Sequence, residues 1–315
     1  ILLNLDSEEE GVFTVGCAGG VDVNCILPIH REAFAGTCLE IKISGLTGGH
    51  SGAEIGKGRA NADMLLGRLL LQLDREALYR LVEVEGGTKD NAIPREARAL
   101  VITPEPEKFQ AGAAAFGKAV QEEHRVTDPG LQVTVEPGNT EELPMDRLST
   151  EKVQCLLTSL PSGVQAMSPE LAGMVQTSLN LGILRLEEGK FRMTFLLRSS
   201  SAAELAQLEQ KVQAVATEFG AAFAVESSYP PWEYRKESQL RDIMVRVFKE
   251  QYGEDPVVET VHAGLECGIL TDKVPGLDAV SFGPDLVEIH STRERMSIAS
   301  VERTWRFVLG VLAAL

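Results

Sequence analysis

A mixed α/β fold with two domains is predicted by three features of this sequence. Strand and helix patterns alternate along the chain, which is typical of α/β and α+β proteins. The clearest helix covers 201–220, where Ser201 and Glu204 form a capping box and Gly220 supplies a stop. The run Tyr-Pro-Pro-Trp at 229–232 resists both helix and central strand, so it predicts a domain joint.

The other elements follow from the spacing of apolar residues. Strands are predicted over 1–5, 12–15, 39–43, 79–85, 97–102, 131–136, 178–186, 190–197 and 279–282. Further helices are predicted over 61–73, 108–123, 150–160, 240–252 and from 297 onward, the last with Ile298, Val301, Trp305, Val308 and Leu312 on its core face. The segment 18–20 is expected to break the second strand. A strand–helix–strand–strand order at about 35–103 and again at about 145–219 suggests two related β-α-β-β repeats.

The composition excludes several classes of function. A formal net charge of −16 argues against binding to nucleic acid or to an anionic membrane, because both depend on clustered Lys and Arg. Apolar runs stop well short of the roughly 18 residues that a membrane helix needs. The 5 cysteines are scattered and form no C-x-x-C pair, which favours a reducing, cytoplasmic location.

Acidic residues follow the first predicted strand directly, in Leu-Asp-Ser-Glu-Glu-Glu-Gly at 5–11. One interpretation is a solvated turn, and the other is a metal site at the carboxyl end of a strand. Asp6 is the best placed ligand for the second interpretation, whereas Glu8 to Glu10 are expected on the surface. The chain also opens without Met inside an apolar run, so we expect a further segment upstream.

Two histidines are candidates for chemistry, each with a structural alternative. His50 lies in the glycine-rich run Gly-Gly-His-Ser-Gly, where the backbone can approach a ligand closely. His290 follows a predicted buried strand, which is a plausible position for a metal ligand. A histidine bonded to loop backbone would explain His290 equally well, and a lone glycine-rich loop is weak support for His50.

Two charged residues complete the candidates. Arg198 ends a predicted strand and could present its planar fork to a carboxylate. Glu266 lies among small residues and needs a partner if it is buried. An ordinary surface ion pair is the alternative for both.

Taken in order along the whole chain, eight short motifs resemble the aminoacyl-histidine dipeptidases, also called peptidase D or Xaa-His dipeptidases. Among them are Gly-Gly-His-Ser-Gly at 48–52, Asn-Ala-Ile-Pro at 91–94 and His-Ala-Gly-Leu-Glu-Cys-Gly at 262–268. The others lie at 4–11, 16–20, 177–182, 197–199 and 288–291.

The resemblance implies an α/β catalytic domain interrupted by an α+β lid domain. The lid would cover 19–228, and the ranges 1–18 and 229–315 would form the C-terminal part of the catalytic domain. It also implies a cytoplasmic metallopeptidase that cleaves Xaa-His and related dipeptides with a hydroxide held by two zinc ions. A homodimer formed through the lid is a further implication.

The resemblance also assigns roles to individual residues. Asp6 and His290 would each bind one of the two zinc ions, and His50 would stabilise the oxyanion. Arg198 and Asn91 would orient the substrate, with Arg198 the better candidate for its free carboxylate. Glu266 would line the cleft.

The sequence departs from the family in one respect. The upstream His-x-Asp motif, the metal-bridging Asp and the Glu-Glu pair of the family have no counterpart. We therefore expect this chain to be inactive alone and to bind zinc weakly or not at all, since a catalytic zinc takes about three protein ligands. The alternatives are a non-catalytic lid or assembly module, and an N-acyl amino acid deacylase or tripeptidase of the wider family.

Overall fold

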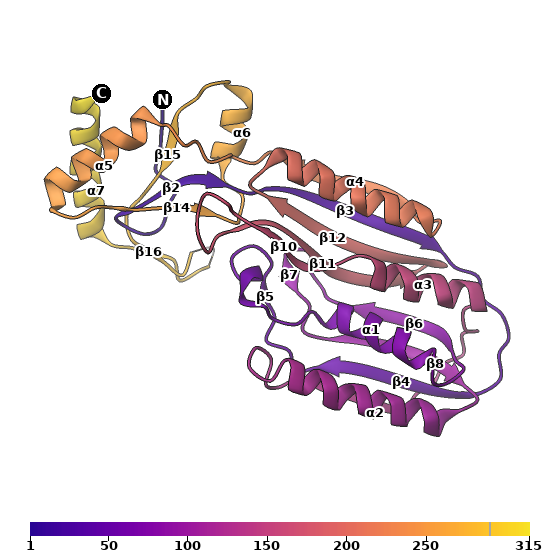
Figure 1. The fold of residues 1–315 in the computed structure, drawn as a ribbon. Coiled ribbons are helices and arrows are strands. Elements are labelled where there is room, and N and C mark those ends of the chain that lie inside the picture. Colours follow the sequence, from indigo (N-terminus) through magenta and orange to yellow (C-terminus); the bar gives the residue numbers. More distant parts are fainter. Residues whose placement is uncertain (290) are drawn as a thin grey trace.

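A computed structural model of the protein describes residues 1–289 and 291–315. Figure 1 shows a smaller part, which holds both chain ends, beside an elongated larger part built on one long sheet. Strands and helices occur in both, so the predicted mixed α/β class is confirmed. The two parts have separate strand ladders. This supports the proposed division of 19–228 from 1–18 and 229–315.

The smaller part is a four-stranded sheet with helices packed on it. Its strand order is β1 (Leu2–Asn4), β15 (Ala279–Ser281), β2 (Val12–Cys17) and β14 (Val257–Val261). Its helices are α5 (Gln239–Tyr252), α6 (Glu266–Lys273) and α7 (Ile298–Ala314). A short hairpin is formed by β16 (Leu286–Val287) and β17 (Arg295–Met296). β1 runs parallel to β15 and β14 parallel to β2, but β15 and β2 are antiparallel.

Packed phenylalanines form the core of the smaller part. The rings of Phe13 and Phe307 stack with centroids 5.5 Å apart, and Phe248 and Phe282 meet them edge-on. The predicted core face of α7 is wrong in part. Trp305 is 58% exposed, and Ile298 and Leu312 are also exposed. The residues of α7 that face the sheet are instead Phe307 and Val311. Apolar residues occur all around this helix, so spacing alone did not identify the buried side.

The larger part is a sheet that, in the described part of the chain, has nine strands. Along the sheet the order is β13 (Ala222–Tyr229), β3 (Gly19–Pro28), β12 (Lys190–Ser199), β11 (Val175–Glu187), β6 (Arg80–Gly86), β8 (Ala97–Thr103), β4 (Thr37–Ser44) and β9 (Gln132–Pro137), with β10 (Gly163–Met167) paired to β11. Its helices are α1 (Ala62–Leu73), α2 (Pro106–Glu123), α3 (Arg147–Ser159) and α4 (Ala202–Glu218). These helices share one continuous apolar core with the sheet.

Two modules of the same design make up this sheet. The inserted module covers 37–137 and contains β4, α1, β6, β8, α2 and β9. The framing module consists of β3 and 147–229, with α3, β11, β12, α4 and β13. In each module the strands lie in the order fourth, first, third, second. The predicted duplication is therefore present.

The predicted extent of the second repeat needs correction. Residues 145–219 begin with a helix, and the strand that opens the framing module is β3 at Gly19–Pro28. We expected residues 18–20 to break a strand, but β3 starts there directly after β2. Glycines read as a break can instead mark a strand position that another side chain approaches closely, and Gly20 is such a position.

The seam between the modules is the antiparallel contact of β6 with β11, which pairs Leu184 with Gly86. The Arg185 guanidinium donates hydrogen bonds to the carbonyls of Gly86 and Gly87, at 3.3 and 3.1 Å. On the other face α1 packs against α3. The short strands β5 (Gly49–His50) and β7 (Ala92–Ile93) pair beside the seam, followed by the 3-10 turn η1 (Ile55–Lys57).

Asp63 is a buried acid under this sheet. It is fully buried at the start of α1, and neither carboxylate oxygen has a hydrogen-bond partner among the described residues. Burial raises the pKa of Asp63 well above its usual range, and the charge of Arg185 offsets this only in part. The carboxyl is therefore favoured in its neutral form in the folded protein.

We expect Asp63→Asn to stabilise the protein at neutral pH. Above about pH 4, the ordinary pKa of a carboxyl group, Asp63 ionises in the unfolded chain and lowers its free energy. In the folded chain Asp63 stays protonated, so the folded state gains nothing. The free energy of unfolding should therefore fall as the pH rises, and the variant should lose this dependence. Urea unfolding at pH 8 should favour the variant by about 1–3 kcal/mol, with a smaller difference at pH 4. Asp74→Asn, at the exposed end of α1, is the matched control, and equal pH profiles for the wild type and Asp63→Asn would contradict the assignment.

Candidate substrate-binding site

Four residues form a row across the end of the larger sheet. In the strand register Ser178 of β11 lies opposite Arg198 of β12, Arg198 lies opposite Gly20 of β3, and Gly20 lies opposite Tyr229 of β13. Residues directly opposite each other point to the same face of a sheet. The side chains of Ser178, Arg198 and Tyr229 are therefore presented together.

Glycine allows Tyr229 to reach Arg198. A Cβ on Gly20 would lie 2.5 Å from the Tyr229 ring, and a Cβ on Gly264 would lie 2.7 Å from it. The ring is thus held between the lid-like sheet and the loop that follows β14. In this position its hydroxyl accepts a hydrogen bond of 2.8 Å from the Arg198 guanidinium.

Arg198 is a buried cation that forms no ion pair with a carboxylate among the described residues, although its charge acts on Asp22 from a longer distance. Its exposed fraction is only 6%, and none of the ion pairs among the described residues involves it. The Nε–H of this guanidinium has no acceptor in the part of the chain that the structure describes. Buried charges are normally paired, so this site is suited to an anionic ligand.

His50 enters from the inserted module. Its Nδ1 accepts hydrogen bonds from the backbone N–H groups of Gly52 and Ala53, both at 3.1 Å. An accepting Nδ1 carries no proton, so the neutral ring has its proton on Nε2. Partial burial of its ring lowers the pKa of His50, and the charge of Arg198 lowers it further. The ring is therefore a neutral N–H donor close to a cation.

Asn91 lies beside the His50 loop. The carbonyl of Asn91 accepts a 2.9 Å hydrogen bond from the backbone N–H of Ser51, and His50 pairs with Ala92 in the β5–β7 ladder. Asn180 of the framing module holds the same segment in place, because its side-chain amide donates hydrogen bonds to the backbone carbonyls of Asp90 and Ala92. The two modules together thus position His50 and Asn91.

His262 is a site residue that sequence reasoning did not select. It is 8% exposed, and its Nε2 lies 2.7 Å from the hydroxyl of Ser178. Burial, with the charge of Arg198, lowers the pKa of His262 to about 4. A Cβ on Gly52 would lie 2.5 Å from the His262 carbonyl, so the His50 and His262 loops touch. The only sequence signal was its place in a small-residue motif.

Glu266 and Asp6 lie on the side of the smaller part. Glu266 is the exposed first residue of α6 and directly follows the loop at 262–265 that contacts the Tyr229 ring. Burial raises the pKa of the neighbouring Cys267 to about 12, with the charges of Glu266 and Asp6 contributing. Asp6 is exposed and lies two residues after the end of β1. His290, the other predicted metal ligand, lies outside the described residues.

The structure thus brings His50 near Arg198 at the joint between the two parts, with Asn91 beside the His50 segment and Glu266 at the start of α6. No group of three His, Cys, Asp or Glu side chains that could hold a metal ion occurs within residues 1–289 and 291–315. Asp6 therefore does not belong to a complete metal centre made from these residues. The predicted zinc ligands stay a prediction.

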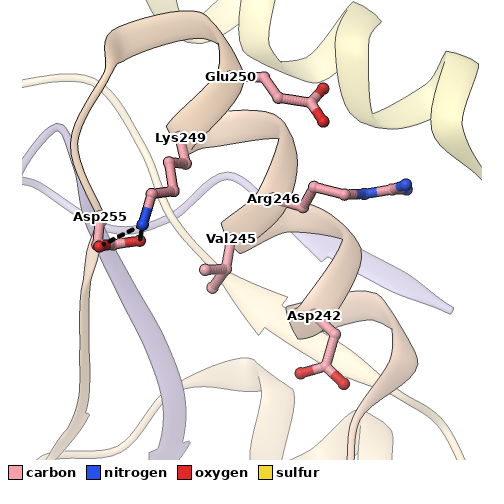
Figure 2. Close-up of a pocket in the computed structure, with 6 residues that line it drawn as sticks. All are labelled: Asp242, Val245, Arg246, Lys249, Glu250 and Asp255. Carbon is pink, nitrogen blue, oxygen red and sulfur yellow. Dashed lines mark hydrogen bonds and ion pairs between the residues drawn. The ribbon is translucent and has the colours of Figure 1, made fainter.

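The hollow on α5 in Figure 2 is a different place. Asp242, Arg246 and Glu250 line it along one helix face, and Lys249 forms an ion pair of 2.9 Å with Asp255 across its rim. All five are exposed. None of the described candidate site residues contributes to this surface.

Arg198→Met should raise the pKa of both His50 and His262, because it removes the positive charge that opposes their protonation. NMR titration of the five imidazoles in the full chain would measure both changes. Arg192→Met is the matched control, since Arg192 lies on the same strand and is paired with Glu226 at 3.7 Å. If the imidazole pKa values moved equally in both variants, the electrostatic contact inferred for Arg198 would be wrong.

Comparison with known proteins gives a consistent result. A family model described as the peptidase dimerisation domain matches residues 41–124, which lie in the inserted module. The cytosol non-specific dipeptidase of Escherichia coli is 31% identical over 99% of this chain and 65% of that protein. The succinyl-diaminopimelate desuccinylase of Helicobacter pylori is 21% identical over 69% of this chain and 55% of that protein.

A solved structure has the same fold throughout. The crystal structure of aminoacylhistidine dipeptidase from Vibrio alginolyticus matches with a TM-score of 0.96 and 35% identity, covering 100% of this chain and 65% of that chain. The chain therefore spans just under two thirds of the length of these two dipeptidases.

Proposed function

Because this chain belongs to the aminoacylhistidine dipeptidase family, we propose that it binds dipeptides and serves the zinc-dependent hydrolysis of Xaa-His and related dipeptides. The observation that carries the proposal is the buried guanidinium of Arg198, which has no carboxylate partner among the described residues. A dipeptide brings its own carboxylate. Arg and carboxylate form short, charge-assisted hydrogen bonds, so a free C-terminal carboxylate is the natural counter-ion.

The roles of the neighbouring groups follow from this orientation. When the C-terminal carboxylate of a dipeptide is bound to Arg198, its peptide bond lies on the N-terminal side of the same residue. The neutral His50 has its proton on Nε2, because its Nδ1 accepts from Gly52 and Ala53. Such a donor can stabilise the oxyanion that forms when the peptide carbonyl is attacked. Asn91 and Glu266 are proposed to contact the substrate from either side.

Asp6 and His290 are the proposed zinc ligands of this chain, and His290 is not among the described residues. A catalytic zinc takes about three protein ligands, and the described residues contain no such group. They therefore do not fit a zinc centre by themselves, and we assign them no metal-dependent step.

We also propose a cytoplasmic location and a homodimer. All 5 cysteines are free, which suits a reducing compartment. Among the described helices none is long and apolar enough to cross a membrane. The dimerisation-domain match supports self-association. Since β6 already pairs with β11 inside the chain, a second copy that extended the sheet would add at the outer strands β9 or β13.

The carboxylate role of Arg198 can be tested by calorimetry on the full chain. The wild type should bind Ala-His more tightly than Ala-His amide, which lacks the carboxylate. Arg198→Met should remove this preference, at a loss of about tenfold or more for one hydrogen bond to a charged group. Arg192→Met should retain it. Equal affinity of the wild type for acid and amide would overturn the proposal.

Catalysis by the 315-residue chain alone is a separate test. We expect no hydrolysis of Ala-His and no tight zinc binding, because the described residues offer no three-ligand group. Amine release would be followed with added zinc and with excess chelator. Stoichiometric, sub-micromolar binding of two zinc ions would contradict this expectation, and turnover in excess chelator would exclude the zinc mechanism itself.

A further inference from the structure

We propose that His262 is a second substrate-binding residue, whose Nδ1–H donates a hydrogen bond to the carboxylate that Arg198 receives. Ser178 is then the positioning residue that fixes the required tautomer of His262. This inference rests on the proposed function, because it extends the carboxylate site to a second donor.

Two buried polar atoms without partners carry the inference. The Nδ1 of His262 and the Nε of Arg198 are both buried, and neither has a hydrogen-bond partner in the part of the chain that the structure describes. Their residues are only 8% and 6% exposed. Leaving a buried polar atom unpaired is costly, about 1–3 kcal/mol each. A ligand with two acceptor atoms on one group would satisfy both at once.

The strand register brings the two groups together. Ser178 lies directly opposite Arg198 in the β11–β12 pair, and the hydroxyl of Ser178 lies 2.7 Å from Nε2 of His262. His262 is therefore tied to the neighbour of Arg198. Burial lowers the pKa of His262, and the charge of Arg198 contributes to the same shift.

Ser178 determines which nitrogen of His262 carries the proton. The hydroxyl of Ser178 is buried, and His262 is its only recorded hydrogen-bond partner within the described residues. If Nε2–H donated to the hydroxyl, the hydroxyl hydrogen would be left buried without an acceptor. If the hydroxyl donates to Nε2, that hydrogen is satisfied and the ring proton lies on Nδ1. Nδ1–H is then a free donor.

The proposed site contains one charged and one neutral hydrogen-bond donor. Arg198 supplies the charge, and a neutral His262 supplies direction without adding a second positive charge. His262 belongs to the smaller part, whereas Arg198 belongs to the larger part. A bound carboxylate would therefore bridge the two parts at their joint, beside His50.

The first test compares Ala-His and Ala-His amide by calorimetry on the full chain. His262→Phe should weaken Ala-His about tenfold and leave the amide unchanged. His30→Phe, which replaces an exposed imidazole of the larger part, is the matched control. If Arg198→Met weakens the acid but His262→Phe does not, this inference is wrong while the proposed function stands. If neither substitution reduces the preference of the wild type for Ala-His over Ala-His amide, the proposed function itself is wrong.

The second test does not depend on the stability of His262→Phe. Nitrogen-15 shifts of the wild-type imidazoles report which ring nitrogen is protonated, and we expect Nδ1 for His262 and Nε2 for His50. Ser178→Ala should produce a mixture of the two His262 tautomers and lower the affinity for Ala-His. Ser178→Thr, which keeps a hydroxyl, should retain both the Nδ1-protonated tautomer and the wild-type affinity. A wild-type His262 protonated on Nε2 would overturn the assignment.

Discussion

The pairing of β6 with β11 is the contact on which the site depends. It joins two modules of the same strand order into one sheet, with β6 from the inserted module and β11 from the framing module. The β5–β7 pair beside the seam contains His50 and is directly preceded at β7 by Asn91, while β11 and β12 carry Ser178 and Arg198. Without the seam these residues would belong to two separate surfaces. Arg185 and Asn180 reinforce the seam by donating to backbone carbonyls across it.

Burial of Arg198 shapes the chemistry of the joint. Taking a guanidinium out of water costs free energy unless it finds charge or good acceptors. The Tyr229 hydroxyl meets only part of that need. Burial lowers the pKa of His50 and His262, and the positive charge of Arg198 adds to both shifts. The buried cation therefore favours an anionic ligand and also helps to keep two imidazoles in the neutral form, in which each can donate through one nitrogen.

Local patterns identified most elements of the fold. Ser201 caps α4 by accepting a hydrogen bond from the Glu204 backbone, as its sequence predicted, and Glu188 and Gly189 turn the β11–β12 hairpin with φ of 51° and 71°. The spacing of residue types did not predict the structure at positions whose role depends on contacts with residues far away in the sequence. Gly20 was read as a strand break because the Tyr229 ring that needs the space lies about two hundred positions away. The exposed face of α7 was misjudged for a similar reason.

By itself the sequence determined the mixed α/β class, the duplication, and the residue types that suit a carboxylate and an oxyanion, since caps, turns and motifs act over short distances. Only the tertiary structure decided which of these residues meet. The cross-strand register set Ser178 beside Arg198, and the contact of the Gly52 and His262 loops linked the two parts. Burial, unpaired donors and the charge that one residue exerts on another depend on folding in three dimensions. For this reason His262 was recognised as a site residue only from the tertiary structure.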